Sequence, residues 1–236
     1  MAYRLPMFPL STVLFPGGLL SLHVFEPRYR RLVADCLAGS GEFGVVLISR
    51  GSEVGGGDQR VSVGSVARVR HARPLGDGRW LLAAEGCRRI RVARWLPDDP
   101  YPVAEVDDLP DDGPGAPGGV AAAVPAEAVQ AEAARAVQRT RALLSELDRP
   151  LPASADLFGV EGAGVEGGDD GDPPVSRPGD VEWLSAASWQ LCAMAPLSPI
   201  DAQGLLEGGD PLARLADLAQ LMDDAAADLV RLLGGG

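Results

Sequence analysis

Short apolar runs divided by proline and glycine dominate the beginning of this 236-residue chain. The runs Arg4–Leu10, Val13–Phe15 and Leu19–Phe25 have the length and composition of β-strands. A turn is expected between the second and third runs, where Pro16, Gly17 and Gly18 follow one another. The opening of the chain therefore predicts three short strands.

The pattern changes from strand to helix at Pro27, because proline is favoured at the first helical position. Apolar residues then recur at helical spacing, at Tyr29, Leu32, Val33, Cys36 and Leu37. This periodicity predicts an amphipathic helix with one buried face, and the helix is expected to end at the glycines around residue 40.

Further strand patterns follow at regular spacing. Phe43–Ser49 is continuously apolar, which is typical of a strand buried on both faces. Gly76-Asp77-Gly78 predicts a hairpin turn, and Glu85-Gly86 predicts a break between two strands. The remaining expected strands are Val61–Arg73, Arg79–Ala84, Cys87–Leu96 and Val103–Leu109. Many short strands with one helix favour a small barrel-like sheet.

Helical periodicity replaces the strand patterns in the second half. Residues 111–119 have the Pro, Gly and Asp content of a linker, and residues 150–179 are acidic and Gly/Pro-rich, as in a long mobile loop. Helices are expected over Pro125–Leu147, from Asp180 to about Ala195, from Ser198-Pro199 to Gly208, and from Asp210-Pro211 onward. The chain therefore divides into a predicted sheet subdomain at 1–110 and a predicted helical bundle at 120–236.

Charge is distributed unevenly between these halves. Residues 1–106 carry 14 arginines and 10 acidic residues, a net charge of +4, whereas residues 107–236 carry 7 and 23, a net charge of −16. No apolar run approaches the ~20 residues that span a bilayer, and the N-terminus lacks a signal-peptide pattern, so we expect a cytoplasmic protein without a membrane segment. Three widely spaced cysteines and two histidines predict reduced thiols and no metal site.

Two motifs resemble the Lon protease N-terminal domain family, also called the LON substrate-binding domain. The first is the opening stretch Leu5–Tyr29. The second runs from Val63-Gly64-Ser65-Val66-Ala67 through Asp77-Gly78 to Glu85-Gly86-Cys87-Arg88-Arg89-Ile90, in the order and spacing of the family's pattern. The resemblance implies an α+β fold, in which a PUA-like small β-barrel with one crossing helix precedes an α-helical bundle. It also implies a stand-alone domain of this family.

The absence of lysine excludes several activities from these residues. A Walker A motif requires lysine on the nucleotide phosphates, and a Ser–Lys peptidase dyad requires it as the base. A pyridoxal-phosphate Schiff base is excluded for the same reason. We therefore expect a non-enzymatic protein with no catalytic residues and no cofactor. A cryptic hydrolase remains an alternative, because folding can assemble a nucleophile–base pair from distant residues.

Candidate binding residues gather where the third strand meets the helix. His23, Phe25, Glu26, Arg28 and Tyr29 are interpreted as the rim of a binding cleft. The structural alternative is a helix start with Glu26 near its positive end and Tyr29 in the core. Phe8, Phe15 and Phe25 either line a groove between barrel and bundle or fill the barrel. By resemblance, such a groove binds unfolded or peptide-like segments, or a partner protein.

A second binding hypothesis rests on arginines of neighbouring strands. Arg68, Arg70, Arg89 and Arg91 define a candidate basic face, and PUA-like barrels include RNA-binding proteins. The net charge of −12 and the 5% aromatic content argue against nucleic acid as the ligand. Cross-strand pairing with Glu85 or Glu105 explains the same arginines structurally. The oligomeric state is not indicated by any of these patterns.

Overall fold

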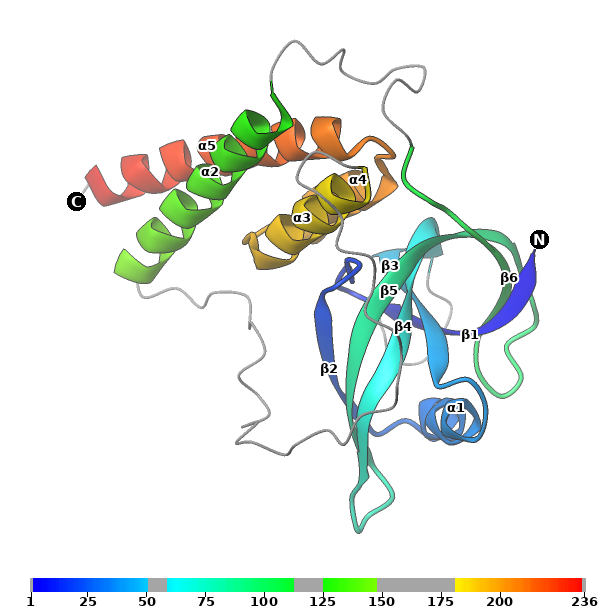
Figure 1. The fold of residues 1–236 in the computed structure, drawn as a ribbon. Coiled ribbons are helices and arrows are strands. Elements are labelled where there is room, and N and C mark those ends of the chain that lie inside the picture. The colour runs from blue at the N-terminus through cyan, green and yellow to red at the C-terminus, as the bar shows by residue number, and fades with distance from the viewer. Residues whose placement is uncertain (1, 51–58, 113–124, 148–180, 235–236) are drawn as a thin grey trace, which may run out of the picture.

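The computed structural model describes residues 2–50, 59–112, 125–147 and 181–234. Most of the predicted loop at 51–59, most of the predicted linker at 111–119 and all of the predicted acidic loop at 150–179 lie outside the described residues. The described residues form six strands and five helices, so the α+β class is confirmed (Figure 1).

The strands form one sheet in the order β2-β5-β4-β3-β1-β6. Their bounds are β1 Tyr3–Leu10, β2 Leu19–Val24, β3 Glu42–Arg50, β4 Gln59–Pro74, β5 Trp80–Trp95 and β6 Val103–Asp108. Only β1 and β3 pair in parallel, and the other pairs are antiparallel. Because β6 pairs with both β1 and β5, strands β5, β4, β3, β1 and β6 form a continuous cycle of pairings. The PUA-like barrel assignment stays a prediction.

Helix α1, Pro27–Ala38, covers the sheet with the predicted face. Tyr29, Leu32, Val33 and Cys36 are buried in a core cluster with side chains from β1 to β5. Leu37 was expected on this face and is exposed instead. The reason is geometric, because about 100° of rotation per residue places Leu37 at the margin of the stripe, beyond Val33.

The predicted strand Val13–Phe15 is wrong, because residues 11–18 form no strand. Leu14 and Phe15 are apolar because each enters a core, not because they belong to the sheet. The Ser65 hydroxyl donates to the Leu14 carbonyl at 2.6 Å and holds this segment against β4. We call residues 11–18 the crossing segment.

The predicted break at Glu85-Gly86 is also wrong, because β5 is continuous through both residues. Gly86 allows the crossing segment to approach the strand closely. A Cβ atom at this position would lie 2.2 Å from the Phe15 carbonyl oxygen. The Gly86 N–H donates to the Gly18 carbonyl, and the Gly86 carbonyl accepts from the Gly17 N–H. The glycine therefore marks a close contact between backbones and not a strand end.

The remaining helices are α2 Ala126–Glu146, α3 Val181–Met194, α4 Pro199–Glu207 and α5 Pro211–Gly234. They gather on one side of the sheet, away from α1 (Figure 1). Ser198 caps α4 as expected, because its hydroxyl accepts from the Asp201 N–H at 3.2 Å. Phe15 and Val63 share one apolar cluster with the buried faces of α2 to α5. The sheet and the helices therefore have a core in common, and the predicted subdomain boundary stays a prediction.

Candidate functional site

A groove runs between the crossing segment and α3. Its first part is a cavity of about 300 Å3, which we call the apolar cavity. Its walls combine the crossing segment and Leu19 with the C-terminal half of α3 and the start of α4. The lining residues are Thr12, Val13, Leu14, Phe15, Gly17, Gly18, Leu19, Gln190, Ala193, Met194, Ala195, Leu197, Pro199 and Ala202. None of these side chains carries a charge, so the cavity is suited to an apolar group.

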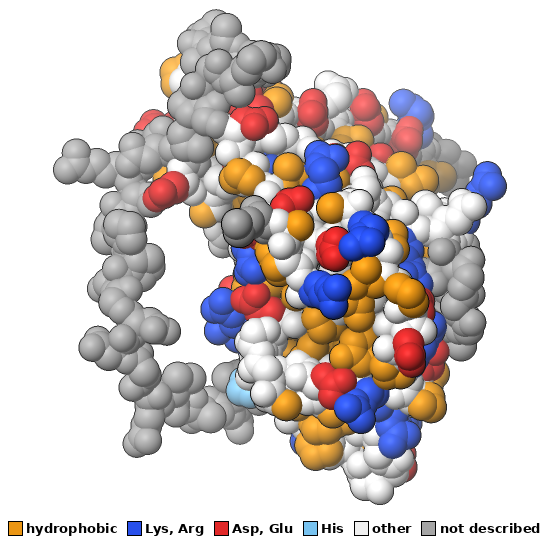
Figure 2. Space-filling model, turned by 90° about the vertical axis from the view of Figure 1, so that its right-hand side faces the viewer, with side chains coloured by type: hydrophobic (Ala, Val, Ile, Leu, Met, Phe, Trp, Pro, Cys, Tyr) orange, Lys and Arg blue, Asp and Glu red, His pale blue; other side chains and the backbone are white. Residues whose placement is uncertain are grey.

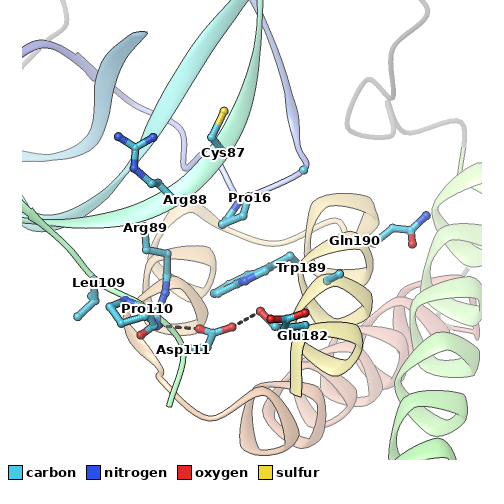
Figure 3. A pocket seen from close by; sticks show the side chains of 13 residues that line it. Pro16, Cys87, Arg88, Arg89, Leu109, Pro110, Asp111, Glu182, Trp189 and Gln190 are labelled. Carbon is cyan, nitrogen blue, oxygen red and sulfur yellow. Dashed lines mark hydrogen bonds and ion pairs between the residues drawn. The ribbon is translucent and has the colours of Figure 1, made fainter. Parts of the chain in front are cut away.

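The second part is a larger cavity of about 800 Å3, which we call the junction cavity. Gly17 and Gln190 line both cavities, so the two are neighbours along one groove. In Figure 3, Pro16 and Cys87 come from the sheet side, and Trp189 and Glu182 come from α3. Unlike the apolar cavity, this one has charged groups in its wall.

A buried ion cluster lies at the base of the junction cavity. Arg89 of β5 and Arg214 of α5 each place a guanidinium nitrogen 2.7 Å from the same Asp111 carboxylate oxygen. All three side chains are buried. Arg214 lies over the Trp189 ring, 3.3 Å from its centroid. Arg89 also approaches that ring (Figure 3), and its guanidinium lies 5.4 Å from the centroid. The cluster therefore joins the sheet, the 110–112 segment and two helices.

Main-chain carbonyls satisfy further donors of these two arginines. Arg89 donates to the carbonyls of Leu206, Gly208 and Pro110, each at 2.9 Å, and Arg214 also donates to Gly208. Burial lowers the pKa of both guanidinium groups, and the Asp111 carboxylate opposes that shift. Because these contacts are made within the protein, the cluster is a structural anchor for the groove.

Two thiols are too buried to act as nucleophiles. Burial raises the pKa of Cys36 and of Cys192 to about 12, which keeps both groups protonated near neutral pH. In the part of the chain that the structure describes, no group of three or more His, Cys, Asp and Glu side chains is placed to hold a metal ion. Within the same residues, no helix has the length and hydropathy needed to cross a bilayer.

The predicted rim residues lie along the end of β2 and the start of α1. His23 and Phe25 are exposed. Glu26 accepts a hydrogen bond from Arg28 at 3.1 Å, and the Arg28 guanidinium lies 4.5 Å from the centroid of the Tyr29 ring. Tyr29 itself is buried and stacks on Phe8 at 4.1 Å, as the structural alternative expected. These five residues are therefore close to the crossing segment in sequence, but they do not line either cavity of the groove.

The four arginines of the candidate basic face are not brought together as free cations. Arg68 pairs with Glu42 at 2.8 Å and Arg70 with Glu85 at 2.7 Å, while Arg91 is exposed. Arg89 is buried in the ion cluster. On the face shown in Figure 2, Arg side chains lie among Asp and Glu side chains rather than in a continuous basic surface. No observation here favours a nucleic-acid ligand.

Sequence reasoning missed several groove residues. Gln190, Met194 and Leu197 come from the helical half, more than 170 residues after the crossing segment that they face. Asp111 was interpreted as part of a linker, because its neighbours are Pro and Asp. No local pattern indicates its two arginine partners, since they lie 22 and 103 residues away in sequence.

The described structure defines a small α+β domain with a groove between its sheet and its helices, and the apolar cavity is the uncharged part of that groove. The family described as "ATP-dependent protease La (LON) substrate-binding domain" matches residues 4–224, and the chain belongs to this family. The resemblance found in the sequence is thereby confirmed.

Relatives and solved structures agree with this assignment. Lon protease 2 of Myxococcus xanthus is 33% identical over 109 residues, which is 45% of this chain and 13% of that protein. A Lon protease of Anaeromyxobacter dehalogenans is 32% identical over the same shares. The crystal structure of a Lon N-terminal domain protein from Xanthomonas campestris has a TM-score of 0.55 and 26% identity, and covers 92% of this chain and 96% of that one. The N-terminal domain of a Mycobacterium avium complex Lon protease shares the fold alone, with a TM-score of 0.53, 16% identity and coverage of 96% and 99%.

Proposed function

We propose that this chain is a non-enzymatic recognition module that binds unfolded, apolar segments of protein substrates in the groove between the crossing segment and α3. The family description names substrate binding, and the relatives are named as proteases. The matched region takes in only 13% of those relatives' length, so recognition rather than cleavage is the part of their activity that we assign to this chain. The cytoplasmic location of the protein stays a prediction.

The apolar cavity is the observation that carries this proposal. It is uncharged throughout, and two apolar side chains on its wall remain exposed, Leu19 at 59% and Met194 at 42%. Folded proteins expose single apolar residues routinely, but here they stand beside a cavity large enough for a side chain. Burial of one Leu-sized side chain contributes about 1.5–3 kcal/mol, so micromolar affinity requires several such contacts along the groove.

Titration of a labelled, unstructured apolar peptide tests the proposal. Fluorescence anisotropy is expected to show saturable binding by the full chain, and weakening of about tenfold in Leu19→Gln and in Met194→Gln, since each change removes apolar surface from the cavity wall. Leu232→Gln is the matched control, because Leu232 is 63% exposed on α5 and does not line the groove.

Two results would contradict the proposal. The first is no saturable binding at high micromolar peptide by a sample that circular dichroism shows to be folded. The second is equal weakening in Leu232→Gln, which would indicate non-specific adsorption to exposed apolar surface.

A further inference from the structure

Strand β2 is the terminal strand of the sheet. Among the described residues it pairs with β5 alone, in a regular antiparallel register from Leu19↔Glu85 to Val24↔Trp80. Proteins usually protect such edges with lysine, proline, charged residues or bulges. The β2 sequence LLSLHV has none of these features. The edge is therefore open to pairing with another extended chain.

The hydrogen-bonding register identifies which main-chain groups face outward. The Gly86 N–H donates to the Gly18 carbonyl directly before the ladder, so the Gly18 carbonyl points toward β5, as it does at a hydrogen-bonded position, although the Gly18 N–H donates to the Phe15 carbonyl instead. Hydrogen-bonded pairs alternate along an antiparallel ladder. The main-chain groups of Leu20, Leu22 and Val24 therefore point toward β5, and those of Leu19, Ser21 and His23 point away from it.

The other side of β5 gives the same phase. The Leu75 N–H donates to the Arg79 carbonyl at 2.7 Å, next to the β4–β5 pair Pro74↔Trp80. Because hydrogen-bonded pairs alternate, the main-chain groups of Leu81 point toward β4 and those of Trp80 point toward β2. The hydrogen bonds at both ends of the β2–β5 ladder therefore agree that the amides of Leu19, Ser21 and His23 point away from β5.

The open edge is continuous with the apolar cavity. Leu19 begins β2 and also lines that cavity. No side chain of β2 or of the cavity wall carries a charge, so a charged segment bound here would find no ion-pair partner in either. The occupant that fits both features is an uncharged extended segment, because its backbone satisfies the edge and an apolar side chain fills the cavity.

We infer that substrate polypeptide binds by strand addition to the free edge of β2, with an uncharged, apolar segment of about six residues and one side chain seated in the apolar cavity. This inference rests on the proposed function and specifies its mode and ligand class. Main-chain hydrogen bonds tolerate many sequences, so the site selects for extended and uncharged segments rather than for one motif. The predicted residues His23 and Phe25 lie along this edge and just beyond its end.

Amide hydrogen exchange of the full chain, followed by NMR, tests the inference. The probe is an eight-residue peptide of alternating leucine and serine with both ends capped. At saturation, the amides of Leu19, Ser21 and His23 are expected to exchange at least tenfold more slowly than in the free protein. The amides of Leu20, Leu22 and Val24 are the internal control, because β5 protects them in both states.

N-methylation of the peptide provides a second readout. Methyl groups on every second amide block one edge of an added strand, so one methylation phase is expected to weaken binding at least tenfold and the other phase to have little effect. Equal affinity of both methylated peptides would overturn strand addition.

The outcomes separate this inference from the proposed function. Peptide binding without slower exchange at Leu19, Ser21 and His23 would overturn strand addition and leave recognition in the groove intact. Slow exchange of these three amides in the free protein, at low or at high protein concentration, would show that the chain or a second copy already occupies the edge, and would also overturn it. Absence of binding would contradict both proposals.

Discussion

Replacement of Asp111 by asparagine tests whether the buried ion cluster holds the sheet and the helices together. The substitution keeps the shape of the side chain and removes its charge, so the buried guanidinium groups of Arg89 and Arg214 lose the carboxylate that they share. Charges about 4 Å apart attract by ~4 kcal/mol at an effective dielectric constant of about 20, and the carboxylate makes two such contacts. Burial of the carboxylate itself costs several kcal/mol. The expected net loss in unfolding free energy is therefore about 3–5 kcal/mol.

Urea unfolding followed by circular dichroism measures this loss. With a denaturant slope of about 2 kcal/mol/M, the midpoint is expected to fall by about 2 M. Asp108→Asn is the control, because Asp108 also accepts from an arginine, Arg88, at 2.9 Å but is 54% exposed. An exposed pair contributes about 0–1 kcal/mol. If Asp111→Asn costs less than about 1 kcal/mol, or no more than the control, the ion cluster is not a structural anchor.

Three further predictions concern close packing and burial. Gly86→Ala is expected to lower the free energy of unfolding by about 1–3 kcal/mol, measured by thermal unfolding, because the added Cβ would meet the Phe15 carbonyl. Gly76→Ala is the control, because a Cβ at Gly76 would lie in open space. Equal effects of the two substitutions would contradict the close contact. Iodoacetamide at pH 8 is expected to modify the half-exposed Cys87 in the folded protein and to spare Cys36 and Cys192, whose pKa burial raises from 9.0 to about 12. Because the unfolded chain releases these two protons near pH 9 and the folded chain near pH 12, the same burial predicts that stability falls as the pH rises from 9 to 12. Peptide mass mapping checks the alkylation, and modification of all three thiols at one rate would refute it.

Local patterns determined most of the secondary structure. The helical spacing of Tyr29, Leu32, Val33 and Cys36 defined α1 and its buried face, because periodicity reports which side of an element is covered. Ser198 followed by Pro199 identified the start of α4, because the capping hydrogen bond lies within one turn. The ordered motifs at Leu5–Tyr29 and after Val63 also identified the family.

Contacts between distant segments decided what the patterns did not show. Arg89 alternates with apolar residues, as a solvent-facing arginine does, yet the helical half covers it and supplies the carbonyls of Leu206 and Gly208. Gly86 resembles a strand break in sequence and is instead a close approach to Phe15. The candidate groove combines the crossing segment with α3, and neither side alone shows that the other exists.

The sequence by itself therefore determined most of the elements and most of their buried faces, since these depend on spacing within a few residues, and its ordered motifs identified the family. The tertiary structure decided which polar groups are buried, where the cavities lie and that β2 is the terminal strand of the sheet among the described residues. The physical reason is that burial of Arg89 and Asp111, and the walls of the apolar cavity, depend on residues brought together from opposite ends of the chain. Spacing along the chain does not indicate which distant residues come together, because only folding brings them into contact.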